Sequence, residues 1–459
     1  MNVLALRRLA PRLLALALTA VLALPLVMPP LPADAQSRLR LTRDAEIEAL
    51  VQDYARPLLK AAGLRANDVQ IVLVADNGFN AFVLGRRLFI NTGAFLAAET
   101  PNEIIAVLAH EIGHIAGGHQ ERLREQLERA KTQAVIAQLV GLGAAIAGAA
   151  SNNGALAGVG QGLALGGPEA ARRGLLSYKR TEEAAADRAA VRYLEATGQS
   201  PVGLRKVFQK FQADRAFASN VNPYLLSHPL PRERMAAIDA LVNESPNRGK
   251  KDPAALQRRH ERARAKVAAY TAGPGSTDRL LRGGGDTARA YGAAIEAFLY
   301  GRPDEAVARI DTVLRALPND PYVHEMKGEI LLRTGQPARA VDSFRRALRL
   351  NGDRSGILRA EIGNALLATD DPARFADAIA NLRRAVIVDP TYTQGHRDMA
   401  RAFNRIGDTA AAHLATAEAF VVEGDIKQAK VFATRAQRGF ERSEPSWRRA
   451  QDIIETRAE

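Results

Sequence analysis

His110-Glu111-Ile112-Gly113-His114 lies inside an apolar segment that begins near Pro101 and has the residue spacing of an α-helix. Two histidines four residues apart share one face of a helix, so both imidazoles can reach a single metal ion. Glu111 lies beside them, where a carboxylate can take a proton from water and pass it to a leaving amine. The stretch therefore predicts a metal-binding helix that carries its own general base.

Short segments upstream predict a small sheet in front of this helix. Residues 69–75 are a β-branched run, and residues 80–84 and 87–90 read as two further strands around Gly85. Residues 41–65 carry apolar side chains at helical spacing. Aromatic residues make up only 5% of the chain, while alanine and leucine are abundant, which favours helix. We expect a mainly α fold with a small β-sheet, of the α+β class.

A catalytic zinc site that leaves one position for water needs a third protein ligand. The chain has no cysteine, so this ligand must be a histidine or a carboxylate. Glu183 and Asp187 lie one helical turn apart, so Glu183 can bind the metal while Asp187 orients a ligand histidine. Glu182 is adjacent and is an alternative ligand. An acidic helix start can also simply complement the helix dipole.

Together, four segments resemble a known family: Asn80-Ala81-Phe82, residues 110–114, Glu183-x-x-Ala186-Asp187, and Ser227-His228-Pro229 with Arg234. They occur in the order found in the zinc metallopeptidases that include HtpX and the CAAX prenyl endopeptidases. The chain looks most like the periplasmic, BepA-like branch of that family. In that branch a gluzincin-type protease domain is followed by a tetratricopeptide (TPR) domain.

The resemblance implies a role for each matching residue around one Zn²⁺ ion per chain. Glu183, rather than Glu182, becomes the third ligand beside His110 and His114. Asp187 falls on a position that supports a ligand, and Glu111 is the general base.

The remaining matching residues each have two interpretations. His228 matches a histidine that can approach the metal and occlude the open position, or it is a structural histidine at the Pro229 turn. Arg234 pairs with a substrate or transition-state oxyanion, or it braces the loop of His228. The resemblance implies that Asn80, Ala81 and Phe82 bind substrate by strand addition, whereas the alternative is ordinary packing of Phe82.

Residues 133–170 are dominated by alanine, glycine, leucine, valine and isoleucine, with no charge from Gln133 to Gly167. Neither half is a convincing transmembrane helix, because each is short or rich in glycine. We expect a helical hairpin buried against the catalytic core. The alternative is a mobile or membrane-touching flap over the cleft.

The C-terminal part of the chain contains a repeat. Residues 243–286 predict a linker, rich in Gly, Pro and charge, with a basic helix at about 253–271. Beyond it, Gly301-Arg302-Pro303 recurs as Gly335-Gln336-Pro337, a period of 34 residues that is typical of TPR helix pairs. We expect an α-solenoid over residues 287–459, with a concave surface suited to a polypeptide. The alternative is an irregular helical bundle.

Residues 1–35 have the features of a cleavable signal peptide. Arg7, Arg8 and Arg12 precede an apolar run, and Ala33-Asp34-Ala35 is a cleavage site. The alternative is a single transmembrane anchor. Export predicts a periplasmic protein whose peptidase domain occupies residues 36–242. The formal net charge of +13 suits solubility, or attraction to anionic lipid or acidic partners.

These features together predict a periplasmic zinc endopeptidase that cleaves misassembled or stalled outer-membrane proteins, the nature of the clients resting on the resemblance alone. We expect polypeptide substrates, a protein partner in the TPR groove, and peripheral contact with the membrane. Nucleic acid is not expected, since no binding motif for it occurs. The alternative function is a TPR chaperone or scaffold whose protease domain is largely latent.

Overall fold

The computed structural model describes residues 39–151, 154–217 and 223–457. The predicted signal peptide at residues 1–35 lies outside this part of the chain. The peptidase portion contains, in order, β1 (Leu41–Thr42), α2 (Ala45–Ala61), η2 (Ala66–Asp68), β2 (Gln70–Val74), β3 (Ala81–Leu84), β4 (Arg87–Asn91), α3 (Gly93–Ala97), α4 (Pro101–Ala116), α5 (His119–Ala150), α6 (Gly154–Ala196), α7 (Val202–Phe217), α8 (Pro223–Ser227) and α9 (Arg232–Glu244).

A four-stranded mixed sheet precedes the metal-binding helix, as predicted. The strand order is β1-β2-β4-β3, with β2 parallel to β4 and the other two pairs antiparallel. β3 is an edge strand, and its partner β4 pairs Phe89 with Phe82, whose rings stack at 4.8 Å between centroids. The sheet therefore leaves β3 at the border of the domain, beside α4, with which it is in contact.

Helix α4 forms the centre of the peptidase core. It begins with Pro101 in its first turn, where the missing N–H costs nothing, and the backbone N–H of Gly117 closes its last turn. Every residue from Glu103 to His114 is buried. α2, α6 and α7 pack around it, and their apolar side chains form one continuous cluster with those of the sheet. A helix that is apolar on most sides can be accommodated because it is surrounded on most sides.

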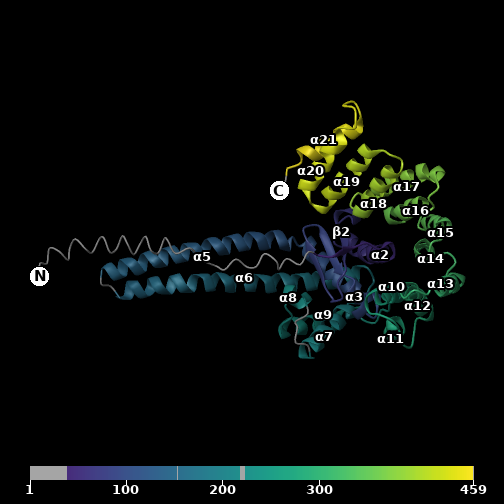
Figure 1. The fold of residues 1–459 in the computed structure, drawn as a ribbon. Helices are drawn as coiled ribbons and strands as arrows, with labels where there is room; N and C mark the ends of the chain where they lie inside the picture. The colour runs from purple at the N-terminus through teal and green to yellow at the C-terminus, as the bar shows by residue number, and fades with distance from the viewer. Residues whose placement is uncertain (1–38, 152–153, 218–222, 458–459) are drawn as a thin grey trace. The chain divides into compact units, whose positions relative to one another are not determined.

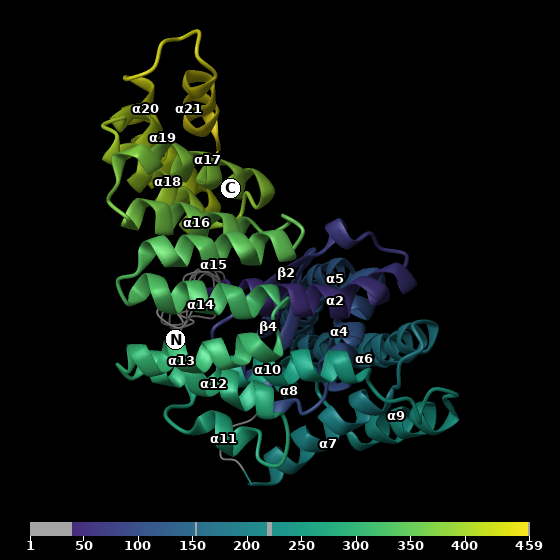
Figure 2. The same ribbon diagram turned by 90° about the vertical axis from the view of Figure 1, so that its right-hand side faces the viewer.

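The C-terminal part is a stack of antiparallel helix pairs, which confirms the predicted fold class of an α+β region followed by helical repeats. Figure 2 shows successive helices of this region lying side by side. The 34-residue period appears directly, because α13 begins at Pro303 and α15 at Pro337. The helices are α12 (Asp286–Leu299), α13 (Pro303–Ala316), α14 (Pro321–Arg333), α15 (Pro337–Leu350), α16 (Gly356–Ala368), η3 (Pro372–Arg374), α17 (Phe375–Val388), α18 (Thr393–Arg405), α19 (Thr409–Glu423), α20 (Ile426–Gln437) and α21 (Pro445–Glu455).

The predicted linker contains α10 (Ala254–Thr271), the expected basic helix, and α11 (Ser276–Leu280). α10 is packed rather than exposed, with contacts to α2 and α3 and to α12. Two of its basic side chains are buried in ion pairs: Arg262 lies 2.7 Å from Glu46, and Lys266 lies 2.8 Å from Asp44. Pairing compensates the loss of hydration, which is why a basic sequence here does not indicate an exposed helix.

The prediction that residues 133–170 form a hairpin buried against the catalytic core is wrong. α5 and α6 do form an antiparallel hairpin (Figure 1), but Leu139, Val140 and Val159 are exposed. The faces of α4 are already covered by other elements, so the hairpin packs on itself. Within the described residues, one helix is long and apolar enough to cross a membrane, His119–Ala147, and only 6% of its most apolar window is buried.

Candidate metal centre

Helix α4 presents both histidines of the motif on one buried face. The Nε2 atoms of His110 and His114 lie 3.0 Å apart, so both rings face the same point. His110 is fully buried and His114 nearly so. The geometry follows from the four-residue spacing, which places the two side chains one above the other along the helix.

Helix α6 supplies an acidic side chain to the same point. Glu183 Oε2 lies 3.4 Å from His110 Nε2, and its Oε1 lies 3.5 Å from His114 Nε2. Gly113 permits this approach, because a Cβ atom at that position would lie 3.1 Å from the carbonyl oxygen of Ala186 on α6. The glycine inside the motif therefore sets how closely the ligand-bearing helices pack.

His228, just after α8, completes the cluster. Its Nδ1 lies 3.0 Å from Glu183 Oε1, and its Nε2 lies 3.4 Å from Glu111 Oε1. One donor atom from each of His110, His114, Glu183 and His228 falls within 4.8 Å of the others, and all four side chains are buried. Imidazoles with a carboxylate are the ligand types of zinc sites, so this group could hold one metal ion.

Asp187 and Arg234 support the cluster from behind. Asp187 Oδ1 lies 2.9 Å from His110 Nδ1, the ring nitrogen that faces away from His114. Burial raises the pKa of Asp187, but Arg234 and His110 outweigh this effect and hold the pKa below its usual value. Burial lowers the pKa of His110, yet hydrogen bonding and charge from Asp187 and Glu183 raise it to about 9. A carboxylate that stays ionised can fix the orientation of a ligand histidine.

Arg234 makes the contacts expected for the bracing alternative. Its guanidinium donates two hydrogen bonds to Asp187, at 2.6 and 2.8 Å, and one to the backbone carbonyl of Pro229 at 3.0 Å. It also lies 2.8 Å from Glu183. Arg234 thus ties α6 to the segment that follows His228.

A second polar chain supports His114. The Nδ1 atoms of His119 and His114 lie 2.8 Å apart, and His119 Nε2 lies 2.7 Å from Glu182. Glu182 in turn accepts a hydrogen bond from Arg122 at 2.8 Å. The structure therefore places Glu182, the alternative ligand, outside the metal-binding group and in contact with a supporting histidine. The five-residue spacing between His114 and His119 was the available signal.

Glu111 is a buried carboxylate next to the cluster. It is fully buried, and neither of its oxygens has a hydrogen-bond partner within the described residues. Burial is the main reason that its pKa is raised above the usual value. A carboxylate in this position has both the free lone pairs and the raised proton affinity that a general base for water requires.

The predicted substrate-binding segment runs into the edge strand β3. Ala81 is fully buried, Phe82 is half-buried against Phe89, and Asn80 accepts a backbone hydrogen bond from Asn91 at 2.9 Å. At the far end of β3, Gln120 binds the backbone on both sides of Leu84: its amide oxygen accepts from Gly85 N at 2.7 Å, and its amide nitrogen donates to Val83 O. Packing of Phe82 is thus present, and the strand still lies at the sheet edge.

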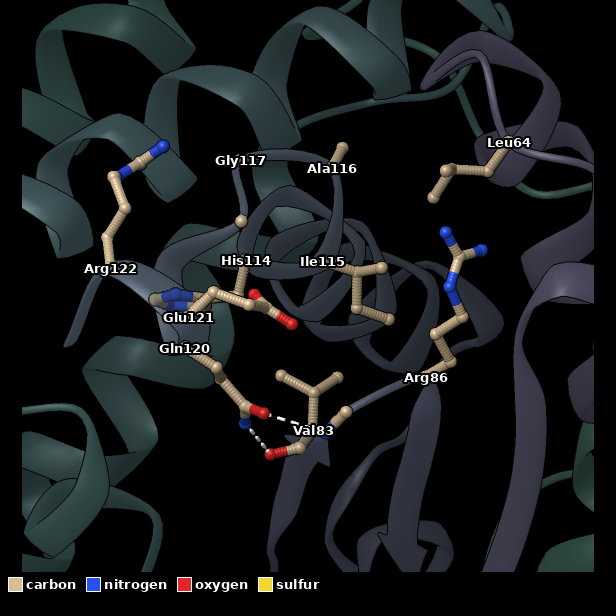
Figure 3. Close-up of a pocket in the computed structure, with 12 residues that line it drawn as sticks. Leu64, Val83, Arg86, His114, Ile115, Ala116, Gly117, Gln120, Glu121 and Arg122 are labelled. Atoms are coloured by element: carbon tan, nitrogen blue, oxygen red, sulfur yellow. Dashed lines mark hydrogen bonds between the residues drawn. The ribbon is translucent and has the colours of Figure 1, made fainter. Parts of the chain in front are cut away.

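A pocket of about 510 Å³ lies between the end of β3 and the end of α4 (Figure 3). His114 is part of its wall, so the pocket borders the metal-binding group. The lining residues are Leu64, Val83, Gly85, Arg86, His114, Ile115, Ala116, Gly117, Gly118, Gln120, Glu121 and Arg122.

Comparisons with known proteins agree with this geometry. Residues 42–242 match the model of peptidase family M48. The chain is 25% identical over 395 residues to the β-barrel assembly-enhancing protease of Yersinia pestis, covering 83% of this chain and 78% of that protein. It is 24% identical over 403 residues to the protein of the same name from Escherichia coli K12, again covering 83% and 78%.

Solved structures similar to part of the chain include a crystal structure of MamA. That match has a TM-score of 0.28 and 20% identity, and it covers 35% of this chain and 90% of MamA. A MamA structure from Desulfovibrio magneticus RS-1 gives a TM-score of 0.29 at 19% identity, covering 37% and 89%.

Proposed function

Residues 42–242 form a metallopeptidase domain of family M48, and from this premise we propose that the chain is a zinc-dependent endopeptidase of outer-membrane protein assembly. The observation that supports the proposal is the convergence of His110, His114 and Glu183 from two helices on one point, with Glu111 beside it. Two imidazoles and one carboxylate are a ligand set that catalytic zinc sites use. When bound, the ion would supply Lewis acidity to the scissile carbonyl and to water.

Side chains of the protein would bind the ion, orient its ligands and transfer the proton. His110, His114 and Glu183 would hold the ion, and Asp187 would keep His110 in the orientation that directs Nε2 toward it. Glu111 would take the proton of the attacking water and deliver it to the leaving amine. The raised pKa of Glu111 suits both steps, since the group must gain and lose a proton near neutral pH.

The substrate is a polypeptide that we place along β3. An edge strand can accept an extended peptide by main-chain hydrogen bonds, and Asn80, Ala81 and Phe82 lie at the end of β3 next to the catalytic helix. The pocket beside His114 continues this surface. The domain order that we propose is a signal peptide at 1–35, a peptidase domain at 36–242, a connecting segment at 243–286 and a TPR domain at 287–459.

The names of the relatives suggest the clients. β-barrel assembly-enhancing proteases match 83% of this chain, a share large enough to include part of the helical repeats. We therefore place the protein in the periplasm, where misassembled or stalled outer-membrane proteins would be its substrates and the TPR groove would bind a client or an assembly machine.

One observation favours the alternative of a scaffold with a largely latent protease. His228 lies against both Glu183 and Glu111, where it provides a fourth donor to the metal-binding group. A fourth protein ligand would occupy the position that water needs in a catalytic site.

Glu111→Gln separates the two functions. We expect cleavage of an unfolded outer-membrane β-barrel by the purified variant to fall about 10²- to 10⁴-fold, because the general base is removed. Glu244→Gln, an exposed glutamate on α9, is the control and should keep wild-type activity. If Glu111→Gln cleaves normally, the catalytic assignment is wrong. If cleavage is lost but the variant rescues every phenotype of a deletion strain, the scaffold is the main function.

A further inference from the structure

In the hairpin of α5 and α6, the charged part of one helix lies beside the charged part of the other, and the uncharged parts likewise lie side by side. Ala137 and Gly167 are opposite each other, since a Cβ atom on Gly167 would lie 2.3 Å from that of Ala137. Near the base, Arg122 is opposite Glu182, at 2.8 Å. In this antiparallel register the last charged residue of α5, Lys131, lies level with Arg172 and Arg173 of α6. Outward of that level the sequence carries one charge, that of Glu169, which forms ion pairs with Arg172 and Arg173. Residues 132–168 carry none.

The uncharged part, which we call the apolar tip (residues 132–151 and 154–168), is arranged as the reverse of a soluble hairpin. Its large side chains point outward, and Leu139 is 66% exposed. Small residues meet where the two helices approach closely, at Ala137 and Gly167. Small residues between helices and large apolar residues on the outside are typical of helices packed in lipid. The exposed large side chains are Val135, Ile136, Leu139, Val140, Leu142, Ile146, Val159 and Leu163.

Two familiar explanations of an apolar helix do not apply to the tip. It is not a core helix, since almost none of its most apolar window is buried. It is not an N-terminal signal sequence, since it lies more than a hundred residues into the chain. Contiguous exposed apolar surface of this extent is costly in water and marks a surface that something else covers.

The base of the hairpin carries charge that suits an anionic surface. Residues 121–131 and 169–180 contain eight basic and four acidic side chains. Some of these side chains form ion pairs, as Glu169 does with Arg172 and Arg173. The basic side chains still outnumber the acidic ones, so the base of the hairpin has a net positive charge. We call Arg129, Lys131, Arg172 and Arg173 the basic collar. Long basic side chains at the border of an apolar segment are favourable at the level of lipid headgroups.

The length of the tip also fits a membrane. Residues 132–150 of α5 extend about 28 Å at 1.5 Å per residue. The hydrocarbon core of a bilayer is about 30 Å thick. The tip can therefore enter the hydrocarbon while the collar remains at the headgroups. The charge nearest the tip is that of Glu169, which forms ion pairs with Arg172 and Arg173 of the collar.

We propose that the apolar tip of the α5–α6 hairpin inserts into a bilayer that contains anionic lipid, with the basic collar at the headgroup level. This docks the metallopeptidase domain on a membrane surface, since α6 continues directly from the tip to Glu183 and Asp187. The proposal does not depend on which polypeptide is cleaved or on whether the protease is latent.

The test is flotation of the full chain with vesicles of phosphatidylcholine and phosphatidylglycerol. Wild-type protein should float with them. Leu139→Asp should reduce the vesicle partition coefficient about a hundredfold, because a carboxylate in the hydrocarbon is strongly unfavourable. Ile387→Asp is the matched control, an equally exposed aliphatic residue on α17, and should float like wild type. Both positions are exposed, so neither change should alter folding, which a thermal melt checks.

The collar has its own variant. Arg172→Gln with Arg173→Gln should lower the partition coefficient about fivefold per charge removed, and the difference should vanish on vesicles of phosphatidylcholine alone. Leu139→Trp, combined with Trp447→Phe to remove the native indole, should show a blue shift of its tryptophan emission when vesicles are added.

Three outcomes overturn the proposal. Wild type does not float, or Leu139→Asp floats as well as wild type, or wild type dimerises without lipid, loses the dimer in Leu139→Asp and never floats. The last result would identify a second copy of the chain as the occupant of this surface.

Discussion

Helix α4 and the apolar tip are both mainly apolar and have opposite surroundings. Alanine and branched aliphatic residues predominate in both. In α4, Leu108 is completely buried by the sheet and three helices, whereas Leu139 in the tip is mostly exposed. The role of an apolar helix therefore depends on what surrounds it: α4 contributes to the stability of the fold, while the tip contributes little until something covers it.

The largest expected difference between the peptidase core and the hairpin is in the effect of removing an arginine on the free energy of unfolding. Arg234→Ala removes the partner of Asp187 and Glu183 and leaves buried carboxylates without compensation, so we expect a loss of about 3–5 kcal/mol in the free energy of unfolding. Arg172→Ala in the collar should leave the free energy of unfolding nearly unchanged, since that ion pair is exposed. Chemical denaturation of both variants without lipid measures this. Equal losses would show that the collar is part of the folded core.

Leucine gives the next contrast. Leu108→Ala leaves a cavity in a fully buried site, and we expect it to cost about 2–5 kcal/mol. Leu139→Ala should change the free energy of unfolding by less than about 0.5 kcal/mol in water. Thermal melts in lipid-free buffer compare the two. A large cost at position 139 would mean that the tip is covered by protein in solution.

The smallest expected difference is between two glycines, where substitution by alanine should change the free energy of unfolding in opposite directions. Gly113→Ala brings a methyl group against Ala186 and Ala189 of α6, so we expect a loss of about 1–3 kcal/mol together with reduced peptidase activity. At Gly143 in α5 a Cβ atom would meet nothing within 4 Å, and alanine there should stabilise the helix by about 0.5–1 kcal/mol. Destabilisation by both changes would contradict the comparison.

The features that the sequence predicts well are those that depend on the spacing of residues close together in the chain. The four-residue interval in the motif, the alternating short strands and the 34-residue period each depend on neighbours along the chain, and the structure confirms the elements they predict. Spacing also proposed Glu183 and Asp187 together, because residues one turn apart share a face. The structure brings Glu183 to the two histidines across the close contact at Gly113.

Features that depend on distant partners were not predictable in the same way. The exposure of the tip is one, because an apolar run on all sides of a helix gives no periodic signal that separates core from surface. The burial of Arg262 and Lys266 is another, because it requires acidic partners from α2, some two hundred residues earlier. The position of Glu182 outside the metal-binding group is a third, because it depends on contacts with His119 and Arg122. Glu182 and Glu183 are adjacent in the sequence, so their spacing alone cannot reveal these contacts.

We propose that Glu183 is the third metal ligand and that Glu182 is not. The most direct measurement is the zinc content of purified wild type, Glu183→Gln and Glu182→Gln, with a thermal melt of each to show that it is folded. Both substitutions keep the size of the side chain and remove one negative charge. We predict that Glu183→Gln loses the metal and that Glu182→Gln keeps it. Full zinc occupancy in a folded Glu183→Gln variant would contradict the assignment.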